Sequence, residues 1–567
     1  MGKPGNGILQ GNTRLMGNYD QCRSISGVTD LNQDIQGVFV EFTFRLQLPA
    51  GVPSASGIFP NQDTGLPVLL WGVCLPAGCD LQDATVIGKQ IAESLNMTHS
   101  GSFLFEDKDP LKDTCFIIAI VVFGVLGCFC FIGTIIDVYV VNKRCKKDKK
   151  KGRTQKTDAG SDAQETQGQG DNSMGTEDSR VSSAPKLEPH YTSIREGSEA
   201  EGVGSKDVPD GVPNEEASAT KKIGIAGRFF LAFSISTNLQ EILAAKHSPS
   251  DIHCLHGIKV MSISWVILGH VFFLTPHFAN LLTVNDMSKW WSFQGITNGV
   301  FAVDTFFLIS GCLVAYLFLK TARRAGGLKW KHMVLYYVHR YLRITPLFAL
   351  AMLFYTGITP YLESGPFARE AHDRDVVCRD TWWANILYIT NLLDDPNACI
   401  NWSWYLPNDM QFYVVAPLAL IPMALGQRVI GLLVTFLLVA CHFTTNAILQ
   451  NKLHTSIYRN VDKLVPNIYI KPWTRVGPYA IGIILGFILF QTKCKARLKK
   501  VYVFLGWLIS AAGALTIVYI SYDNVKDYGI AKATWSYLSA DVYETVKIPV
   551  WSLCVGWVIF ACASGYG

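Results

Sequence analysis

Two ionisable residues in one apolar stretch are the first candidates for chemistry. Lys259 and His270 lie in the segment 252–275, which is otherwise apolar enough to cross a membrane. They are eleven residues apart, so a helix would carry both on one face, roughly 16 Å apart along its axis. Because ionisable groups in a bilayer usually face a bundle interior or a watery cavity, we expect this face to line a reaction or transport cavity. The alternative is that Lys259 extends to the interface and His270 bonds a neighbouring helix.

A second apolar stretch, 299–318, contributes Asp304 near one end and Ser310 near its middle. Asp304 is a candidate for orienting His270, since a base needs a partner that fixes its tautomer. A helix cap and a pair with a cation are the other roles open to this carboxylate. Gly299 and Gly311 in the same stretch permit close helix approach.

Two further groups of polar residues stand at the ends of apolar stretches. Arg340 and Arg343 are three residues apart and share a helix face, which suits phosphate but is also typical of a positive cytoplasmic flank. Trp404, Asp409 and Gln411 open a later stretch. The tryptophan fits a membrane interface, whereas the aspartate and glutamine are candidates for lining an acceptor site.

The sequence contains no motif for several other chemistries. It has no G-x-S-x-G, no Walker A, no H-E-x-x-H and no pair of C-x-x-C motifs with zinc spacing. We therefore expect neither a metal nor a bound cofactor. The net charge of +5 is better explained by cytoplasmic loops than by a nucleic-acid surface, so no nucleic-acid partner is predicted.

The composition indicates that these residues belong to a polytopic α-helical membrane protein. Of 567 residues, 49% are hydrophobic and 17% charged, and much of the charge lies between 143 and 222. Runs of about 20 apolar residues are long enough to span a bilayer. The predicted spans are 116–136, 256–275, 299–319, 334–357, 405–424, 429–446, 476–490, 501–521 and 547–563.

The basic run 143–153 directly follows the first span and predicts the orientation of the chain. Positive flanks stay in the cytoplasm, so 1–114 is expected to be lumenal or extracellular and the linker 143–250 cytoplasmic. Both N-x-Ser/Thr sequons, at Asn96 and Asn401, then fall on the lumenal side, which predicts a glycoprotein. Such a protein would reside in the plasma membrane or the endoplasmic reticulum.

The chain divides into five predicted parts: an N-terminal domain (1–114), a first transmembrane helix (115–142), a basic and then disordered linker (143–222), an amphipathic segment at the membrane surface (223–250), and a multi-span core (251–567). The N-terminal domain should be α+β, with strands in 37–51 and 66–80 and a helix over 80–96 capped by Asp80. No signal peptide is visible at its start.

Five cysteines in polar segments are disulfide candidates in an oxidising compartment. Cys22, Cys74 and Cys79 fall in the N-terminal domain, where their odd number leaves the pairing open. Cys378 and Cys399 share one predicted lumenal loop and can close a disulfide there.

These motifs, in this order, resemble a known family. Lys259-x10-His270, the stretch from Gly299 to Gly311, and Arg340-x-x-Arg343 resemble the acyltransferase-3 superfamily of membrane proteins. GILQGN, YDQC, CLHGIKVMS, WYLPNDMQFY and YIKPWTRVGPYAIGIILG resemble the nose resistant to fluoxetine proteins of invertebrates. The resemblance covers nearly the whole chain outside 154–220. Eight predicted spans follow the first helix here, whereas family cores usually have ten, and family members usually begin with a signal peptide and more lumenal sequence. The chain is therefore expected to be truncated at both ends.

The resemblance implies transfer of an acyl group from a cytoplasmic acyl thioester, such as acyl-CoA as co-substrate, to a hydroxyl on a small molecule or lipid. His270 would be the general base, supported by Ser310 and Asp304. Lys259, Arg340 and Arg343 would hold the donor phosphates.

The sequence departs from the family pattern at two of the singled-out positions. Lys259 replaces the commoner arginine, and Asp409 stands where glutamate is frequent. The alternative function is a carrier of lipids or hydrophobic small molecules in epithelia, without acyl transfer. A third interpretation, a receptor whose lumenal domain binds a ligand, rests on the disulfide-containing domain alone.

Overall fold

A computed structural model describes most of the chain outside the predicted linker. The described residues are 14–28, 34–46, 68–105, 109–158, 224–244, 252–273, 286–287, 289–362, 365, 369–393, 399–456, 461–525 and 535–567. The predicted disordered linker falls largely on residues outside this set. Two compact units divide the chain, one formed by 1–119 with 249–567 and the other by 120–248. Each is described by itself.

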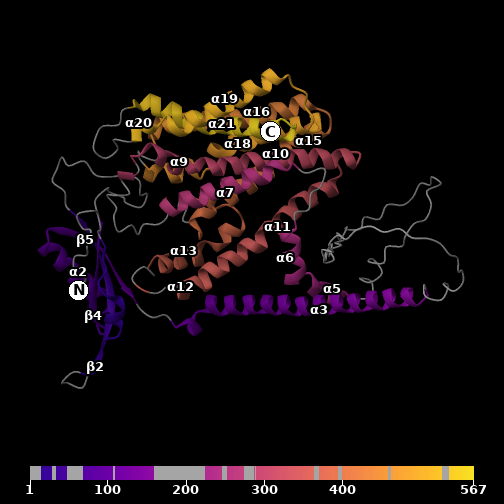
Figure 1. The fold of residues 1–567 in the computed structure, drawn as a ribbon. Helices are drawn as coiled ribbons and strands as arrows, with labels where there is room; N and C mark the ends of the chain where they lie inside the picture. Colours follow the sequence, from indigo (N-terminus) through magenta and orange to yellow (C-terminus); the bar gives the residue numbers. More distant parts are fainter. Residues whose placement is uncertain are drawn as a thin grey trace, which may run out of the picture. The chain divides into compact units, whose positions relative to one another are not determined.

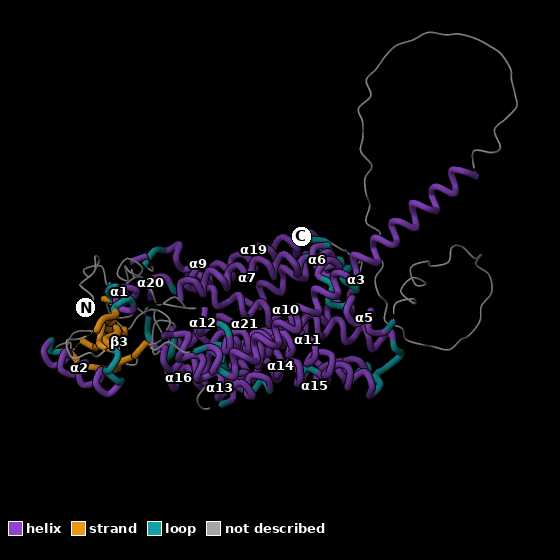
Figure 2. The backbone as a smooth tube through the Cα atoms, turned by 90° about the horizontal axis from the view of Figure 1, so that it is seen from below, coloured by secondary structure: helices purple, strands orange, loops and turns teal. Residues whose placement is uncertain are grey.

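The N-terminal domain is a five-stranded sheet with one long helix (Figure 2). Its strands are β1 (Arg14–Leu15), β2 (Ser26–Val28), β3 (Asp34–Leu46), β4 (Val68–Pro76) and β5 (Met97–Phe105). The central strand β3 pairs antiparallel with β2, β4 and β5, and β1 runs parallel to β4. The predicted α+β domain is confirmed.

Alternation along β3 decides which side chains form the core of this domain. Val40, Phe42 and Phe44 are fully buried on one face, together with Ala84 and Ala92 of α2 (Leu81–Ser94). The opposite face buries Phe39 against Phe105 and the short helix α1 (Tyr19–Arg23). Asp80 caps α2 as predicted, and its side chain accepts hydrogen bonds from the backbone N–H groups of Gln82 and Asp83, each at 2.8 Å.

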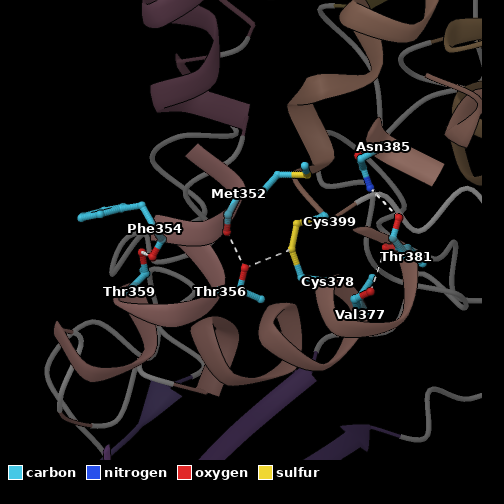
Figure 3. The surroundings of a disulfide bond; sticks show 9 residues. All are labelled: Met352, Phe354, Thr356, Thr359, Val377, Cys378, Thr381, Asn385 and Cys399. Atoms are coloured by element: carbon cyan, nitrogen blue, oxygen red, sulfur yellow. Dashed lines mark hydrogen bonds between the residues drawn. A yellow bond between two sulfur atoms is a disulfide. The ribbon is translucent and has the colours of Figure 1, made fainter. Parts of the chain in front are cut away.

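The structure contains two disulfides among the predicted candidate cysteines. Cys22 bonds Cys74 within the N-terminal domain, and Cys79 is a free thiol. Cys378 bonds Cys399, as the shared loop predicts. Figure 3 shows this second disulfide beside Thr356, whose hydroxyl donates to the carbonyl oxygen of Met352 and contacts the Cys378 sulfur.

Among the described residues, seven helices are long and apolar enough to cross a membrane. They lie in α3 (Thr114–Asp158), α7 (Cys254–Phe273), α10 (Phe301–Arg324), α16 (Arg428–Leu453), α18 (Pro472–Thr492), α19 (Lys500–Tyr519) and α21 (Tyr537–Ala563). Two other predicted spans become α11 (Trp330–Gly357) and the pair α14 (Tyr405–Val415) and α15 (Pro417–Ala424), which are not among the seven. The break between α14 and α15 falls at Pro417, which lacks the N–H that an unbroken helix needs.

Shorter elements connect these helices. They are η2 (Pro110–Lys112), η3 (Trp291–Phe293), α9 (Gln294–Thr297), η4 (Asn298–Val300), α12 (Thr359–Leu362), α13 (Arg369–Ile386), η5 (Thr390–Leu392), η6 (Asn401–Trp404), α17 (Val461–Leu464), η7 (Val465–Tyr469) and α20 (Tyr522–Val525). The predicted lumenal loop between the spans 334–357 and 405–424 thus contains an 18-residue helix, α13. A hydrogen bond from Arg379 of α13 to Asp113, at 2.6 Å, ties this segment to the start of α3.

The helices α10, α16, α18 and α21 pack on one another and form the centre of the core (Figure 1). Glycine allows α10 and α18 to touch backbone to backbone. A Cβ at Gly311 would lie 2.1 Å from the carbonyl oxygen of Tyr479, and one at Gly482 would lie 2.2 Å from that of Leu308. The predicted close approach at Gly311 is confirmed, whereas Gly299 makes ordinary contacts with Trp265 at 3.4–3.5 Å.

The helix α16 shows the reversed polarity expected of a membrane-embedded bundle. Its buried face carries Thr435, His442, Asn446 and Gln450, each at most 2% exposed. Its exposed face is apolar and includes Leu433, Phe436, Leu437 and Ile448. Polar side chains inside and apolar side chains outside are stable in lipid and costly in water. The chain is a polytopic α-helical membrane protein.

In the second unit, α3 is longer than predicted and carries a helical pair. It runs for 45 residues and includes the basic run 143–153, which was expected to lie beyond the helix. The amphipathic segment forms α5 (Ile225–Leu231) and α6 (Ile235–Leu243). Asp137 of α3 accepts hydrogen bonds from Ser234 at 2.7 Å and Thr237 at 2.5 Å. The location of the amphipathic segment, α5 and α6, at the membrane surface stays a prediction.

Candidate functional site

The helix α7 presents Lys259 and His270 at the margin of its packed face. The two side chains are about 20° apart around the helix axis. Leu255, Ser262 and Gly269 are buried and mark the packed face, which lies on one side of both. Lys259 is half-buried, whereas His270 is exposed and lies in the last turn. His270 is therefore nearer the helix end than predicted.

Lys259 meets a second cation from another helix. Arg343 of α11 is close enough to Lys259 for the two positive charges to repel each other. Within the described part of the chain, neither has a carboxylate at ion-pair distance. The Arg343 side chain is exposed, so two cations from separate helices without a carboxylate partner are available to an anionic ligand.

Arg340 does not join this pair, although the sequence predicts that it binds donor phosphate with Lys259 and Arg343. Its guanidinium forms an ion pair with Asp409 of α14 and lies over the ring of Tyr413, 4.7 Å from the ring centre. Arg340 and Arg343 are about 60° apart around α11, so they lie on one broad face yet meet different neighbours. Arg340 is also ten residues inside α11, about 15 Å along its axis, and so lies deeper than a flanking residue would.

The same carboxylate binds Ser310. The Ser310 hydroxyl donates a 2.6 Å hydrogen bond to Asp409 Oδ1, while Oδ2 accepts from Arg340. Asp409 is only 4% exposed. The prediction of Asp409 as an open acceptor residue does not match this arrangement. A predicted catalytic residue, a donor-binding residue and an acceptor residue instead form one polar cluster, the Ser310–Asp409–Arg340 triad.

Asp304 is paired with Arg475, which is not among the residues predicted for the site. Both of its carboxylate oxygens accept from Nη1 of Arg475 in α18, each at 3.0 Å. The side chains are 0% and 5% exposed, so this is a buried ion pair. The predicted orientation of His270 by Asp304 is not found, while pairing with a cation is. Arg475 was overlooked because it stands at the edge of a predicted span, where a flanking charge is ordinary.

The remaining predicted acceptor residues stabilise the segments around α14. Gln411 donates to Asn391 at 2.8 Å and to the carbonyl oxygen of Tyr388 at 2.9 Å. The ring of Trp404 packs against Tyr469 and the Arg475 guanidinium. Both side chains are thus held by neighbours in this structure.

Comparison with known proteins identifies the core. Residues 252–566 match the family model described as "Acyltransferase domain" of the acyltransferase-3 type. The chain belongs to the acyltransferase-3 family. Residues 1–88 match the "Nose resistant-to-fluoxetine protein, N-terminal domain", so this member belongs to the nose resistant to fluoxetine branch. No solved structure matches this acyltransferase-3 chain.

Relatives of this acyltransferase-3 protein occur in animals and bacteria. Nose resistant to fluoxetine protein 6 of Caenorhabditis elegans is 32% identical over 60% of this chain and 44% of its own length. Regulator of hypoxia-inducible factor 1 of the same nematode is 23% identical over 47% and 56%. A putative O-acetyltransferase of Staphylococcus aureus is 24% identical over 47% and 39%. The chain thus spans about half the length of these relatives.

Proposed function

We propose that this protein is a membrane O-acyltransferase that moves an acyl group from an acyl thioester of the acyl-CoA type to a hydroxyl acceptor. The observation that supports it best is the pair of uncompensated cations, Lys259 and Arg343, contributed by α7 and α11. A donor with phosphates at one end and a thioester at the other needs such a pair at a distance from the reacting group. His270 lies roughly 16 Å along α7 from Lys259, which suits that separation.

His270 would act as general base on the acceptor. As a ring nitrogen takes the hydroxyl proton, the acceptor oxygen bonds the thioester carbonyl carbon and the C–S bond breaks. The leaving thiolate then takes up the proton held by the imidazole. The exposed side chain of His270 leaves it free to meet an acceptor that arrives from outside the bundle.

The Ser310–Asp409–Arg340 triad would support the reaction by position rather than by binding phosphate. It joins α10, α11 and α14, so it fixes α11, the helix that carries Arg343, relative to the core. We place the donor on the cytoplasmic side because the charged ends of the helices predict that orientation.

The test is release of free CoA from labelled acyl-CoA by the purified full-length chain in lipid nanodiscs, with a panel of alcohols as acceptors. His270→Ala should reduce the rate at least 100-fold, the range expected for a general base. His332→Ala is the matched control because this partly exposed histidine lies in the first turn of α11. Lys259→Gln should raise the KM for acyl-CoA. Lys331→Gln, which removes an exposed lysine from the first turn of α11, should leave this KM unchanged.

A rate that survives His270→Ala would overturn the role of this residue. No release by the wild type, together with saturable binding of a hydrophobic amphiphile, would favour the carrier function instead. A KM unchanged by Lys259→Gln would show that the Lys259–Arg343 pair does not hold the donor.

A further inference from the structure

The two N-x-Ser/Thr sequons of the chain lie in different surroundings in the structure. The first, residues 96–98 (NMT), joins α2 to β5 in the N-terminal domain, and the second, residues 401–403 (NWS), lies in η6 directly before α14. A glycosylated asparagine needs an exposed position, because the attached sugar is bulky and hydrophilic. The structure therefore distinguishes two sites that the sequence alone leaves equivalent.

Asn96 ends α2 in an exposed turn. Its backbone has a φ of 54°, in the left-handed region, which asparagine adopts more readily than most residues. Asn96 and the preceding Leu95 are both exposed, so the side-chain amide of Asn96 is accessible to an enzyme. A left-handed turn alone would explain an asparagine here, so the case for modification also needs the hydroxyl residue of the sequon.

Thr98 supplies that hydroxyl on the outer face of β5. Alternation along the strand turns Met97 toward the core of the domain and Thr98 away from it. Thr98 is exposed, and its hydroxyl donates a hydrogen bond of 3.3 Å to the carbonyl oxygen of Arg45. Both side chains that a glycosyltransferase recognises in the sequon are therefore accessible in the folded domain.

The second sequon is confined on both sides. Cys399, two residues before Asn401, is held in the disulfide with Cys378, and α14 begins at Tyr405. Ser403 is only 7% exposed, and its hydroxyl oxygen is buried. The hydroxyl that the enzyme has to recognise is thus withdrawn from the surface of the folded protein.

Distance along the chain from a membrane span separates the two sequons before folding as well. Asn401 precedes the predicted span 405–424 by four residues, which extend at most about 14 Å. Asn96 precedes Thr114, the first residue of α3, by 18 residues, which extend at most about 60 Å. An enzyme that acts in the lumen therefore reaches Asn96 more easily than Asn401, which its own span holds near the bilayer.

A sugar on Asn96 would cover an edge of the sheet. β5 has β3 as its one neighbour among the described strands, so the other side of β5 is an edge. The backbone groups of an uncovered edge strand can pair with a strand of another chain. Because Asn96 directly precedes the first residue of β5, the bulk of a glycan there would hinder the approach of a second strand.

We propose that Asn96 is N-glycosylated, that Asn401 is not, and that the glycan protects the edge of β5 from pairing with a second copy of the chain. In the reaction, the side-chain nitrogen of Asn96 bonds the anomeric carbon of an oligosaccharide carried on a lipid diphosphate. The bond from that carbon to the diphosphate breaks, the lipid diphosphate leaves, and the amide gives up one proton. The proposal depends on the predicted lumenal position of the N-terminal domain and is independent of acyl transfer.

The experiment uses the full-length chain expressed in animal cells and digested with peptide N-glycosidase. Digestion should increase the gel mobility of the wild type and convert Asn96, but not Asn401, to aspartate, which mass spectrometry of the peptides detects. Thr98→Ala should abolish the mobility shift, whereas Thr98→Ser keeps the hydroxyl and should retain it. Asn401→Gln is the matched control and should leave the shift unchanged.

The protective role is measured by size-exclusion chromatography of the same proteins in detergent. Asn96→Gly removes the glycan but keeps the turn, since glycine adopts the left-handed conformation without strain. Asn96→Gly, Thr98→Ala and the digested wild type should all contain a larger oligomeric fraction than the undigested wild type, and Thr98→Ser should not. A wild type without a mobility shift, aspartate at position 401, or an oligomeric fraction that loss of the glycan leaves unchanged would overturn the proposal.

Discussion

The buried pair Asp304–Arg475 predicts a specific pattern of stability changes. Replacement of Arg475 by Met removes the cation and leaves the Asp304 carboxylate, which is 0% exposed, with no compensation. Breaking such a pair from one side costs about 3–5 kcal/mol. The loss also includes the contact of the guanidinium with the Tyr469 ring, 4.4 Å from its centre.

This cost converts into a measurable shift of the thermal midpoint. For domains of this size a loss of 1 kcal/mol lowers the midpoint by about 2–4 °C, so Arg475→Met should lower it by about 6–20 °C. Asp304→Leu should cost a similar amount because it leaves Arg475 alone. The double variant replaces the pair by apolar groups and should regain about 2 kcal/mol or more of the summed loss.

The assay is a double-mutant cycle on the purified chain in detergent, followed by tryptophan fluorescence during heating. Arg428→Met is the matched control, because this exposed arginine begins α16 without an ion pair to any described residue and should change stability by less than about 0.5 kcal/mol. If the two single losses add within about 0.5 kcal/mol in the double variant, the residues are not coupled and the argument is refuted.

Three further predictions concern other parts of the chain. Gly482→Ala places a Cβ 2.2 Å from the carbonyl oxygen of Leu308 and should cost more than about 1–3 kcal/mol in thermal unfolding, while Gly124→Ala, with open space around it, should cost nothing. Cys22→Ser opens a disulfide that spans 52 residues and should destabilise the N-terminal domain by about 4 kcal/mol in urea; equal loss on reduction of the wild type checks the cause. Burial opposes ionisation of Asp113, but the bonds from Arg379 and Tyr361 prevail and lower its pKa to about 2. Its stabilisation is therefore present above its ordinary pKa of about 3.9 and is lost as the pH falls through about 2, so Asp113→Asn should lower the thermal midpoint at pH 6 and make little difference below about pH 1.

Local features of the fold could be predicted from the sequence because local chemistry determines them. Asp80 caps α2 because its side chain reaches N–H groups only two and three residues away. The alternation along β3 and the Cys378–Cys399 disulfide follow from short-range spacing in the same way. Apolar runs located the spans, since length and hydropathy are properties of one segment.

The contacts of the candidate residues could not be predicted from the sequence. Lys259, Arg343, Ser310 and Asp409 were all selected as candidates, yet the sequence assigned Arg340 to the phosphate and Asp304 to His270. The Arg340–Asp409 bond joins residues 69 positions apart, and Asp304 meets Arg475 across 171 positions. No periodicity or motif in the sequence predicts contacts between residues so far apart in the chain. Those contacts depend on which helices pack against each other.

Polar contacts are what decide those neighbours in a bilayer. Lipid tails are as apolar as leucine, so apolar faces such as that of α16 gain little by choosing one helix over another. A carboxylate inside the bundle, by contrast, is stabilised where a cation from another helix reaches it, as at Asp304 and Asp409. Asp304 fixes α10 to α18, and Asp409 fixes α14 to both α10 and α11. Among the described residues, Lys259 and Arg343 have no carboxylate at ion-pair distance, which is why we propose a ligand rather than packing as their partner.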